Sequence, residues 1–188
     1  DADKIDREII VRNSKKGESF IALDDKKYTL QKDMCVIADK SGVLGLGGVI
    51  GGTRSGTEIE TKNILLESAY FLPSSIRKTS KQLSLETDAK YRFERGIDPN
   101  SMIDGLKIAT DLILKICGGE ASKFNISGKK EYKNKSIDLE VGKFKKTIGI
   151  DITTSEIKKI LNSLGFLTKS GKKPLKVLIP TWRPDVNQ

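Results

Sequence analysis

The sequence predicts an α+β protein in two parts, and three observations lead to this prediction. Short runs of β-branched and apolar residues follow one another up to about residue 40, which is typical of packed short strands. Apolar residues then recur every three or four positions over residues 99–117, which predicts a helix. The composition becomes polar and basic near residue 123, and a strand–helix–strand pattern follows. The second part is therefore expected to be a smaller domain.

The strands of the first part are runs of β-branched or apolar residues bounded by turn-forming residues. They are expected at residues 8–12, 19–23, 28–30 and 34–39, directly before a glycine-rich run. Residues 61–71 have the apolar density of a strand packed between two layers, and Glu67 lies inside this run. The first part is therefore expected to be rich in short strands.

Two helices are expected after these strands. Pro73 at a first turn, neighbouring serines as caps and helical spacing predict one at residues 72–85. The second, at residues 99–117, ends at a glycine pair that serves as a C-cap.

The second part is expected to follow a polar linker at residues 123–135. It should contain a strand at 136–141, a helix at 153–166 that Thr153 or Thr154 caps, and a strand at 173–180. It lacks an obvious closing element, so we expect the chain to be a fragment of a longer protein.

Composition limits what the chain does. Its 188 residues, 37% of them hydrophobic, suffice for a core. The longest apolar stretches fall short of the ~20 residues that cross a bilayer, and no signal-peptide pattern opens the chain, so we expect a cytoplasmic location and no membrane partner. The chain has no histidine, which removes the commonest general base and metal ligand, and we expect no metal site.

Charge and cysteines add weaker indications. The formal net charge of +9 favours polyanionic partners, although surface lysines that only contact solvent explain it equally well. Cys35 and Cys117 lie in separate apolar runs without partners at metal-ligand spacing. They are expected to be buried thiols in a reducing compartment.

The glycine-rich run at residues 42–56 has three interpretations. Its spacing matches neither GxxxxGK[ST] nor a GxGxxG that opens a helix, which argues against a nucleotide site. A glycine-rich turn or bulge between strands remains open. So does a pocket wall at which a ligand approaches bare backbone.

Carboxylates are the other candidates for chemistry. Burying Glu67 is costly unless it is hydrogen-bonded or used, but on a half-exposed strand it would simply face solvent. A second charged cluster could be functional or a surface ion-pair network. It comprises Glu86, Asp88, Arg92, Glu94 and Arg95.

Several motifs resemble the beta subunit of bacterial phenylalanyl-tRNA synthetase. They are "GVIGG", "ESAYFLPSSIR", "TDAKYRFERG", "ITTSEIKKILNSLGF" and "VLIPTWRPDV". The resemblance covers practically the whole chain and implies the later part of the B3/B4 tRNA-editing domain at residues 1–122, a linker at 123–135 and a truncated, winged-helix-like B5 domain at 136–188. The opening residues resemble the segment that follows an editing-site histidine of the family, so the fragment is expected to begin just after it.

The resemblance implies hydrolytic editing. In this family the alpha subunit attaches phenylalanine to tRNA(Phe) with ATP and magnesium, and the beta subunit removes tyrosine attached by mistake. The implied partners are tRNA(Phe) and the alpha subunit, in a heterotetramer of two alpha and two beta subunits; no cofactor is expected in the fragment itself. The editing-pocket residues of the family fall on Gly51, Glu67, Thr87 and Ala89. The sequence departs from the family pattern at Ser84, usually glycine, and Lys90, usually serine.

This assignment agrees with simple chemistry. A carboxylate at Glu67 would bind the tyrosine hydroxyl and would be left unpaired against phenylalanine. Gly51 and Ala89 would leave room for the substrate, and Thr87 would hydrogen-bond a water or the substrate. No nucleophile with a base is visible, so we expect a positioned water, assisted by a hydroxyl of the terminal ribose, and we expect the isolated fragment to be inactive.

The alternative is a non-catalytic RNA-binding or scaffold module of the same subunit. It rests on lysines of the second part that could meet nucleic acid. They are Lys143, Lys145, Lys146, Lys158, Lys159, Lys172 and Lys173.

Overall fold

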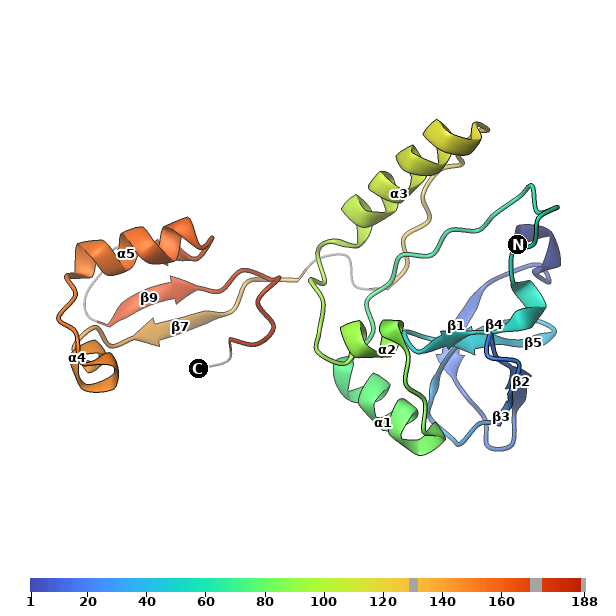
Figure 1. The fold of residues 1–188 in the computed structure, drawn as a ribbon, viewed down its shortest axis with the longest axis horizontal. Helices are drawn as coiled ribbons and strands as arrows, with labels where there is room; N and C mark the ends of the chain where they lie inside the picture. The colour runs from blue at the N-terminus through green and yellow to red at the C-terminus, as the bar shows by residue number, and fades with distance from the viewer. Residues whose placement is uncertain (129–131, 170–173, 187–188) are drawn as a thin grey trace. The chain divides into compact units, whose positions relative to one another are not determined.

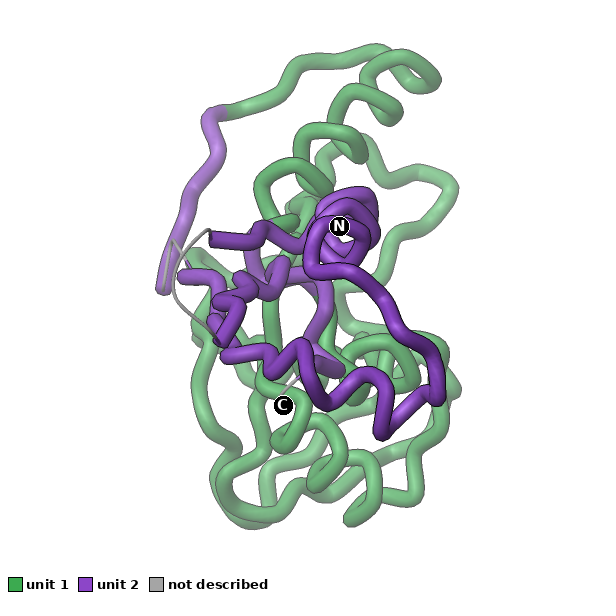
Figure 2. The backbone as a smooth tube through the Cα atoms, turned by 90° about the vertical axis from the view of Figure 1, so that its left-hand side faces the viewer, with its two compact units in different colours: residues 1–97, 101–122 green, residues 98–100, 123–188 purple. Residues whose placement is uncertain are grey.

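The structure is a computed structural model that describes residues 1–128, 132–169 and 174–186. It divides into two compact units (Figure 2), Asp1–Ile97 with Ser101–Ser122, and Asp98–Asn100 with Lys123–Gln188. Each unit combines antiparallel sheets with separate helices, which confirms the α+β class. None of the helices in the described ranges has the length and apolar character that a membrane span requires.

The first unit opens with short strands (Figure 1). An antiparallel sheet has the order β1–β4–β5–β6, and β2 and β3 form a separate hairpin. The strands predicted before residue 40 are present with slightly shifted ends. The elements are η1 (Ala2–Lys4), β1 (Ile10–Asn13), β2 (Ser19–Ile21), β3 (Lys27–Thr29), β4 (Cys35–Asp39), β5 (Gly42–Leu46), β6 (Ile50–Gly51) and η2 (Thr53–Ser55).

The core of this unit lies on one face of the sheet. Val36 and Ala38 alternate with more accessible neighbours along β4, so the strand turns every second side chain inward. Helix α1 (Pro73–Leu83) covers them with Ile76. It begins at Pro73 as predicted, but its N-cap is Leu72, without a side-chain hydrogen bond, so the prediction of a serine cap is wrong. Helix α2 (Asp88–Phe93) packs beside α1.

The prediction of a buried strand at residues 61–71 is wrong. Ile64, Leu65 and Leu66 are 47%, 50% and 38% exposed, and no described strand pairs with this segment. Apolar density predicts burial but supplies no partner for the backbone N–H and C=O groups, and a strand needs a neighbouring strand for these. The segment instead leads to Phe71, which is buried in the core.

The helix predicted at residues 99–117 is present as α3 (Met102–Cys117), and Gly118 ends it with a φ of 73°. None of its residues is fully buried, and Ile108, Leu112 and Ile116 of its apolar stripe are 68%, 55% and 73% exposed. Cys117, at its end, is exposed and Cys35 is half-buried, so the prediction of two buried thiols is wrong.

The second unit is built on a three-stranded antiparallel sheet of order β7–β9–β8, against which α5 packs Ile157. Thr153 caps α5 as one of the two predicted candidates and forms a capping box with Glu156. Helix α4 and strand β8 were not predicted, because both are short and lack a clear apolar period. The elements are β7 (Ser136–Leu139), α4 (Lys143–Ile148), α5 (Thr154–Ser163), β8 (Leu167–Lys169) and β9 (Leu175–Leu178).

Candidate functional site

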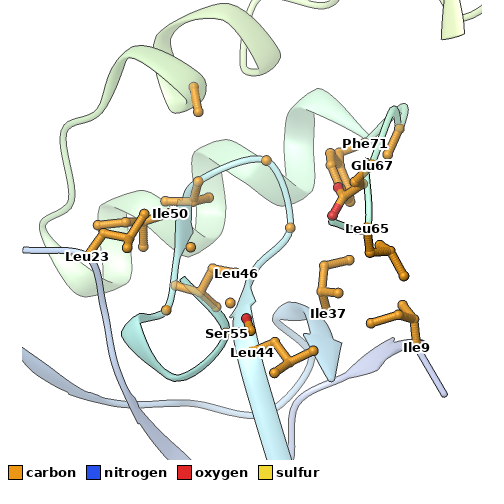
Figure 3. A pocket seen from close by; sticks show the side chains of 18 of the residues that line it. Ile9, Leu23, Ile37, Leu44, Leu46, Ile50, Ser55, Leu65, Glu67 and Phe71 are labelled. Atoms are coloured by element: carbon orange, nitrogen blue, oxygen red, sulfur yellow. The ribbon is translucent and has the colours of Figure 1, made fainter. Parts of the chain in front are cut away.

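A cavity of about 700 Å³ lies within the first unit (Figure 3). Its walls come from β5, the β5–β6 turn, β6, the segment around Glu67 and the first turn of α2. Apolar side chains such as Ile37, Leu65 and Phe71 dominate the lining. The cavity therefore favours a largely apolar group, oriented by the few polar atoms that it offers.

Glu67 is the acid of this cavity. Figure 3 shows its side chain projecting into the cavity beside Leu65 and Phe71. Solvent reaches this side chain, yet the surrounding protein atoms displace enough water to raise the pKa of Glu67 above its ordinary value. No hydrogen bond or charge from the described residues contributes to this shift. Glu67 is thus an acceptor without a protein donor, in surroundings that disfavour its charge.

Glu67 also influences the nearby thiol of Cys35, at the start of β4. Burial raises the pKa of the Cys35 thiol, and the negative charge of Glu67 raises it further. The thiol is therefore protonated at neutral pH and is a poor nucleophile.

Three of the four predicted site residues line this one cavity. Gly51 lies in β6, where its carbonyl accepts a 3.0 Å hydrogen bond from the Leu23 N–H. A Cβ at Gly51 would come within 3.1 Å of the Leu23 side chain, so Leu23 packs against bare backbone at this wall. Ala89, in the first turn of α2, presents only a methyl group. Glu67 thus supplies an acid to this cavity, and Gly51 and Ala89 contribute no side chain larger than a methyl group to its walls.

Thr87 is the exception, because it does not line the cavity. Its hydroxyl donates to the Val49 carbonyl at 2.6 Å and accepts from the Lys90 N–H at 3.0 Å. Thr87 is thereby the N-cap of α2. The structure places it directly behind the cavity wall that Val49 forms.

The two departures from the family pattern lie close to α2. Ser84 follows α1 with a φ of 52°, the left-handed region that favours the glycine usual in the family. Lys90 forms ion pairs with Glu86 at 2.8 Å and Glu94 at 3.2 Å. Part of the charged cluster noted in the sequence is therefore an ion-pair network centred on Lys90.

The glycine-rich run forms strands and a tight turn. A Cβ at Gly47 would lie 2.5 Å from the Phe71 ring, and one at Gly48 would lie 2.8 Å from both Phe71 and Ile76. The ring thus packs directly on bare backbone. The Gly47 and Val49 N–H groups donate to backbone carbonyls, so these amides are not free to bind a phosphate.

Sequence reasoning missed the residues that assemble this site. Phe71 packs on the glycine turn and contacts Phe93 of α2 edge to face, with ring centroids 5.3 Å apart. Its place four residues after Glu67 gave no signal. The Ser68 hydroxyl donates to the Met102 carbonyl at 2.8 Å, so it is committed to structure. No metal-binding group of histidine, cysteine or acidic residues occurs in the described ranges.

Family models identify a B3/4 domain followed by a tRNA synthetase B5 domain. The chain belongs to the family of the B3/4 domain, whose model matches residues 1–118, and the model of the tRNA synthetase B5 domain matches residues 137–188. Its curated relatives are phenylalanine–tRNA ligase beta subunits. The protein from Rhodopseudomonas palustris is 42% identical over 187 residues and that from Mesorhizobium japonicum is 40% identical. The resemblance seen in the sequence is thereby confirmed.

The match covers all of this chain but only 23% of either relative, so the chain spans about a quarter of their length. Among solved structures, an N-terminal fragment of the phenylalanyl-tRNA synthetase beta subunit from Pyrococcus horikoshii is 17% identical. The structural match covers 99% of this chain and 54% of the Pyrococcus horikoshii fragment, with a TM-score of 0.47.

Proposed function

We propose that the cavity of the first unit is an editing site that hydrolyses the ester of tyrosine wrongly attached to tRNA(Phe). The observation that carries this proposal is the placement of Glu67, an acceptor without a protein donor, at one end of an apolar cavity. Gly51 and Ala89 line the same cavity and contribute no side chain larger than a methyl group. The proposed substrate is an aromatic aminoacyl group with a hydroxyl on its ring.

Selection follows from the difference of one hydroxyl group. Tyrosine donates a hydrogen bond to Glu67, whereas phenylalanine leaves that acceptor without water or partner. Unpaired polar groups in a binding site produce strong discrimination, because their desolvation is not compensated. The raised pKa of Glu67 agrees with a carboxylate that lacks a partner until the substrate arrives.

Hydrolysis is assigned to a positioned water. The Ser68 hydroxyl is hydrogen-bonded to backbone, the Cys35 thiol is protonated at neutral pH, and the chain contains no histidine. The water attacks the ester carbonyl, the bond to the ribose oxygen breaks, and free tyrosine and tRNA are released. A hydroxyl of the terminal ribose assists this step, and the protein contributes orientation.

The complete enzyme supplies the rest of the reaction. Its proposed partners are tRNA(Phe) and the alpha subunit, which uses ATP and magnesium, in a cytoplasmic heterotetramer of two alpha and two beta subunits. The turn amides noted above offer no phosphate cradle, so no step involving ATP is assigned to this chain. Residues 1–188 alone are expected to be inactive in editing.

The test is deacylation of tyrosyl-tRNA(Phe) by the complete beta subunit with its alpha subunit. Glu67→Ala removes the acceptor and should slow tyrosine removal about 10- to 100-fold, the value of a hydrogen bond to a charged group. Phenylalanine attachment should be unchanged. Glu60→Ala, which removes an exposed acid outside the cavity, is the control. Equal clearance by wild type and Glu67→Ala would show that this carboxylate does not select the substrate.

A scaffold role is the second candidate, for the second unit. Lys143 pairs with Glu140 at 3.1 Å, and Lys145 pairs with Asp151 at 2.5 Å. These pairs neutralise part of the positive charge that would otherwise attract a phosphate backbone. Salt-dependent binding of tRNA that Glu67→Ala leaves unchanged would instead favour an RNA-binding module.

A further inference from the structure

The turn between β5 and β6 forms part of the cavity wall, and its first two residues are glycines, which have no side chains to anchor the turn. Gly47 and Gly48 touch Phe71 only through backbone, and Gly48 has a φ of 69°. Val49 ends the turn and is 1% exposed. The position of this wall therefore depends on contacts made to the turn by neighbouring elements.

Thr87 provides a side-chain contact of this kind, in addition to the 3.0 Å hydrogen bond from the Gly47 N–H to the Cys35 carbonyl of β4. Its hydroxyl donates to the Val49 carbonyl at 2.6 Å, a separation of 38 positions in the sequence. The same hydroxyl accepts a 3.0 Å hydrogen bond from the Lys90 N–H and thereby caps the start of α2. This bond also sets the position of Ala89, which directly precedes Lys90 in the helix. One hydroxyl thus joins the glycine turn to the helix that forms another part of the cavity wall.

The capacity of a hydroxyl limits what else Thr87 does. A threonine hydroxyl has one proton, and here Val49 receives it. One lone pair receives the Lys90 N–H, and the residue does not line the cavity. A role as donor to a substrate or to the attacking water would require breaking the bond to Val49.

We infer that Thr87 is a positioning residue, which sets the distance between the glycine-turn wall and the α2 wall of the cavity without touching the substrate. Its effect on editing rests on the proposed function, whereas its effect on the two walls does not. The methyl group of Thr87 is dispensable in this role and its hydroxyl is not.

The test compares Thr87→Val, which keeps the shape and removes the hydroxyl, with Thr87→Ser, which keeps the hydroxyl. Both are made in the complete beta subunit with its alpha subunit. Amide hydrogen exchange is followed in residues 46–51 and 88–94, together with deacylation of tyrosyl-tRNA(Phe). Thr87→Val should accelerate exchange in both segments about 2- to 30-fold, as for loss of an N-cap. It should slow deacylation as well, and Thr87→Ser should restore both properties.

Thr153→Val is the matched control, since it removes the N-cap hydroxyl of α5 in the other unit. It should accelerate exchange in α5 and leave residues 46–51 and deacylation unchanged. Slower deacylation by Thr87→Val with unchanged exchange in both segments would overturn the inference and assign Thr87 a direct contact.

Three further outcomes are decisive. Unchanged exchange and unchanged deacylation in Thr87→Val would also overturn the inference. If the wild type does not deacylate tyrosyl-tRNA(Phe), the proposed function fails, while the exchange data still decide whether Thr87 holds the two walls. If Thr87→Val does not assemble with the alpha subunit, assembly of Thr87→Ser with wild-type exchange supports the hydroxyl, and altered exchange in Thr87→Ser refutes it.

Discussion

The Arg54 guanidinium binds the Asp39 carboxylate through two hydrogen bonds, of 2.9 and 2.6 Å. The Asp39 side chain is fully buried and also accepts from the backbone N–H groups of Asp6, Ser41 and Gly42. Arg54 lies in η2, directly after the wall that Gly51 forms. This ion pair therefore fastens one end of the cavity to the end of β4, and it lowers the pKa of Asp39 to about 2.

Asp39→Asn should lower the free energy of unfolding at pH 7 by ~2 kcal/mol, because a lowered pKa records stabilisation of the charged form. In the wild type this contribution is present above the ordinary pKa of 3.8 and is lost as the pH falls from there to about 2. Urea unfolding at a series of pH values measures it. Asp25→Asn, in an exposed turn, is the control. If Asp39→Asn lost as much stability below pH 4 as the wild type does, the Asp39 carboxylate would not be the source of this contribution.

Glu67→Gln should act in the opposite direction and stabilise the first unit at pH 7. The pKa of Glu67 is raised in the folded state, so folding binds its proton more tightly and stability falls as the pH rises past the ordinary value of 4.5. The amide has no charge to desolvate, so the difference between variant and wild type should disappear below pH 4. Thermal unfolding at both pH values measures this. Lower stability of Glu67→Gln at pH 7 would indicate a favourable partner for the carboxylate.

Gly48→Ala should destabilise the first unit by ~2–5 kcal/mol. Its φ of 69° disfavours a side chain by about 1–2 kcal/mol, and the added Cβ would overlap Phe71 and Ile76, which costs about 1–3 kcal/mol more. Gly119→Ala is the matched control, since Gly119 has a φ of 95° but no atoms within 4 Å of an added Cβ. Equal losses in urea unfolding of the two variants would show that packing against Phe71 is unimportant.

Thr153→Ala should destabilise the second unit by about 1 kcal/mol, because it removes the N-cap and the capping box with Glu156. The hydrogen bonds from Thr153 also lower the pKa of Glu156, so this loss should diminish in acid. Thr154→Ala, one residue later and inside the helix, is the control. Circular dichroism during urea unfolding reports both variants, and equal stability of the two would contradict the capping role.

Local signals predicted much of the fold from the sequence. The helices α1, α3 and α5 follow from their periodicity and end signals, which act within a few residues. Short β-branched runs located the strands before residue 40 for the same reason. The motifs around Glu67, Thr87 and Ala89 identified the family.

Tertiary structure decided what these segments contact. The sequence could not show that residues 61–71 lack a strand partner, that part of the apolar stripe of α3 stays exposed, or that the Thr87 hydroxyl bonds to Val49. It also did not show that Phe71 requires the bare backbone at Gly47 and Gly48. Residue type and spacing determine local conformation and the chemistry a side chain can offer. Whether a group finds a partner or remains free for a ligand depends on segments far apart in the sequence, and only folding brings those together.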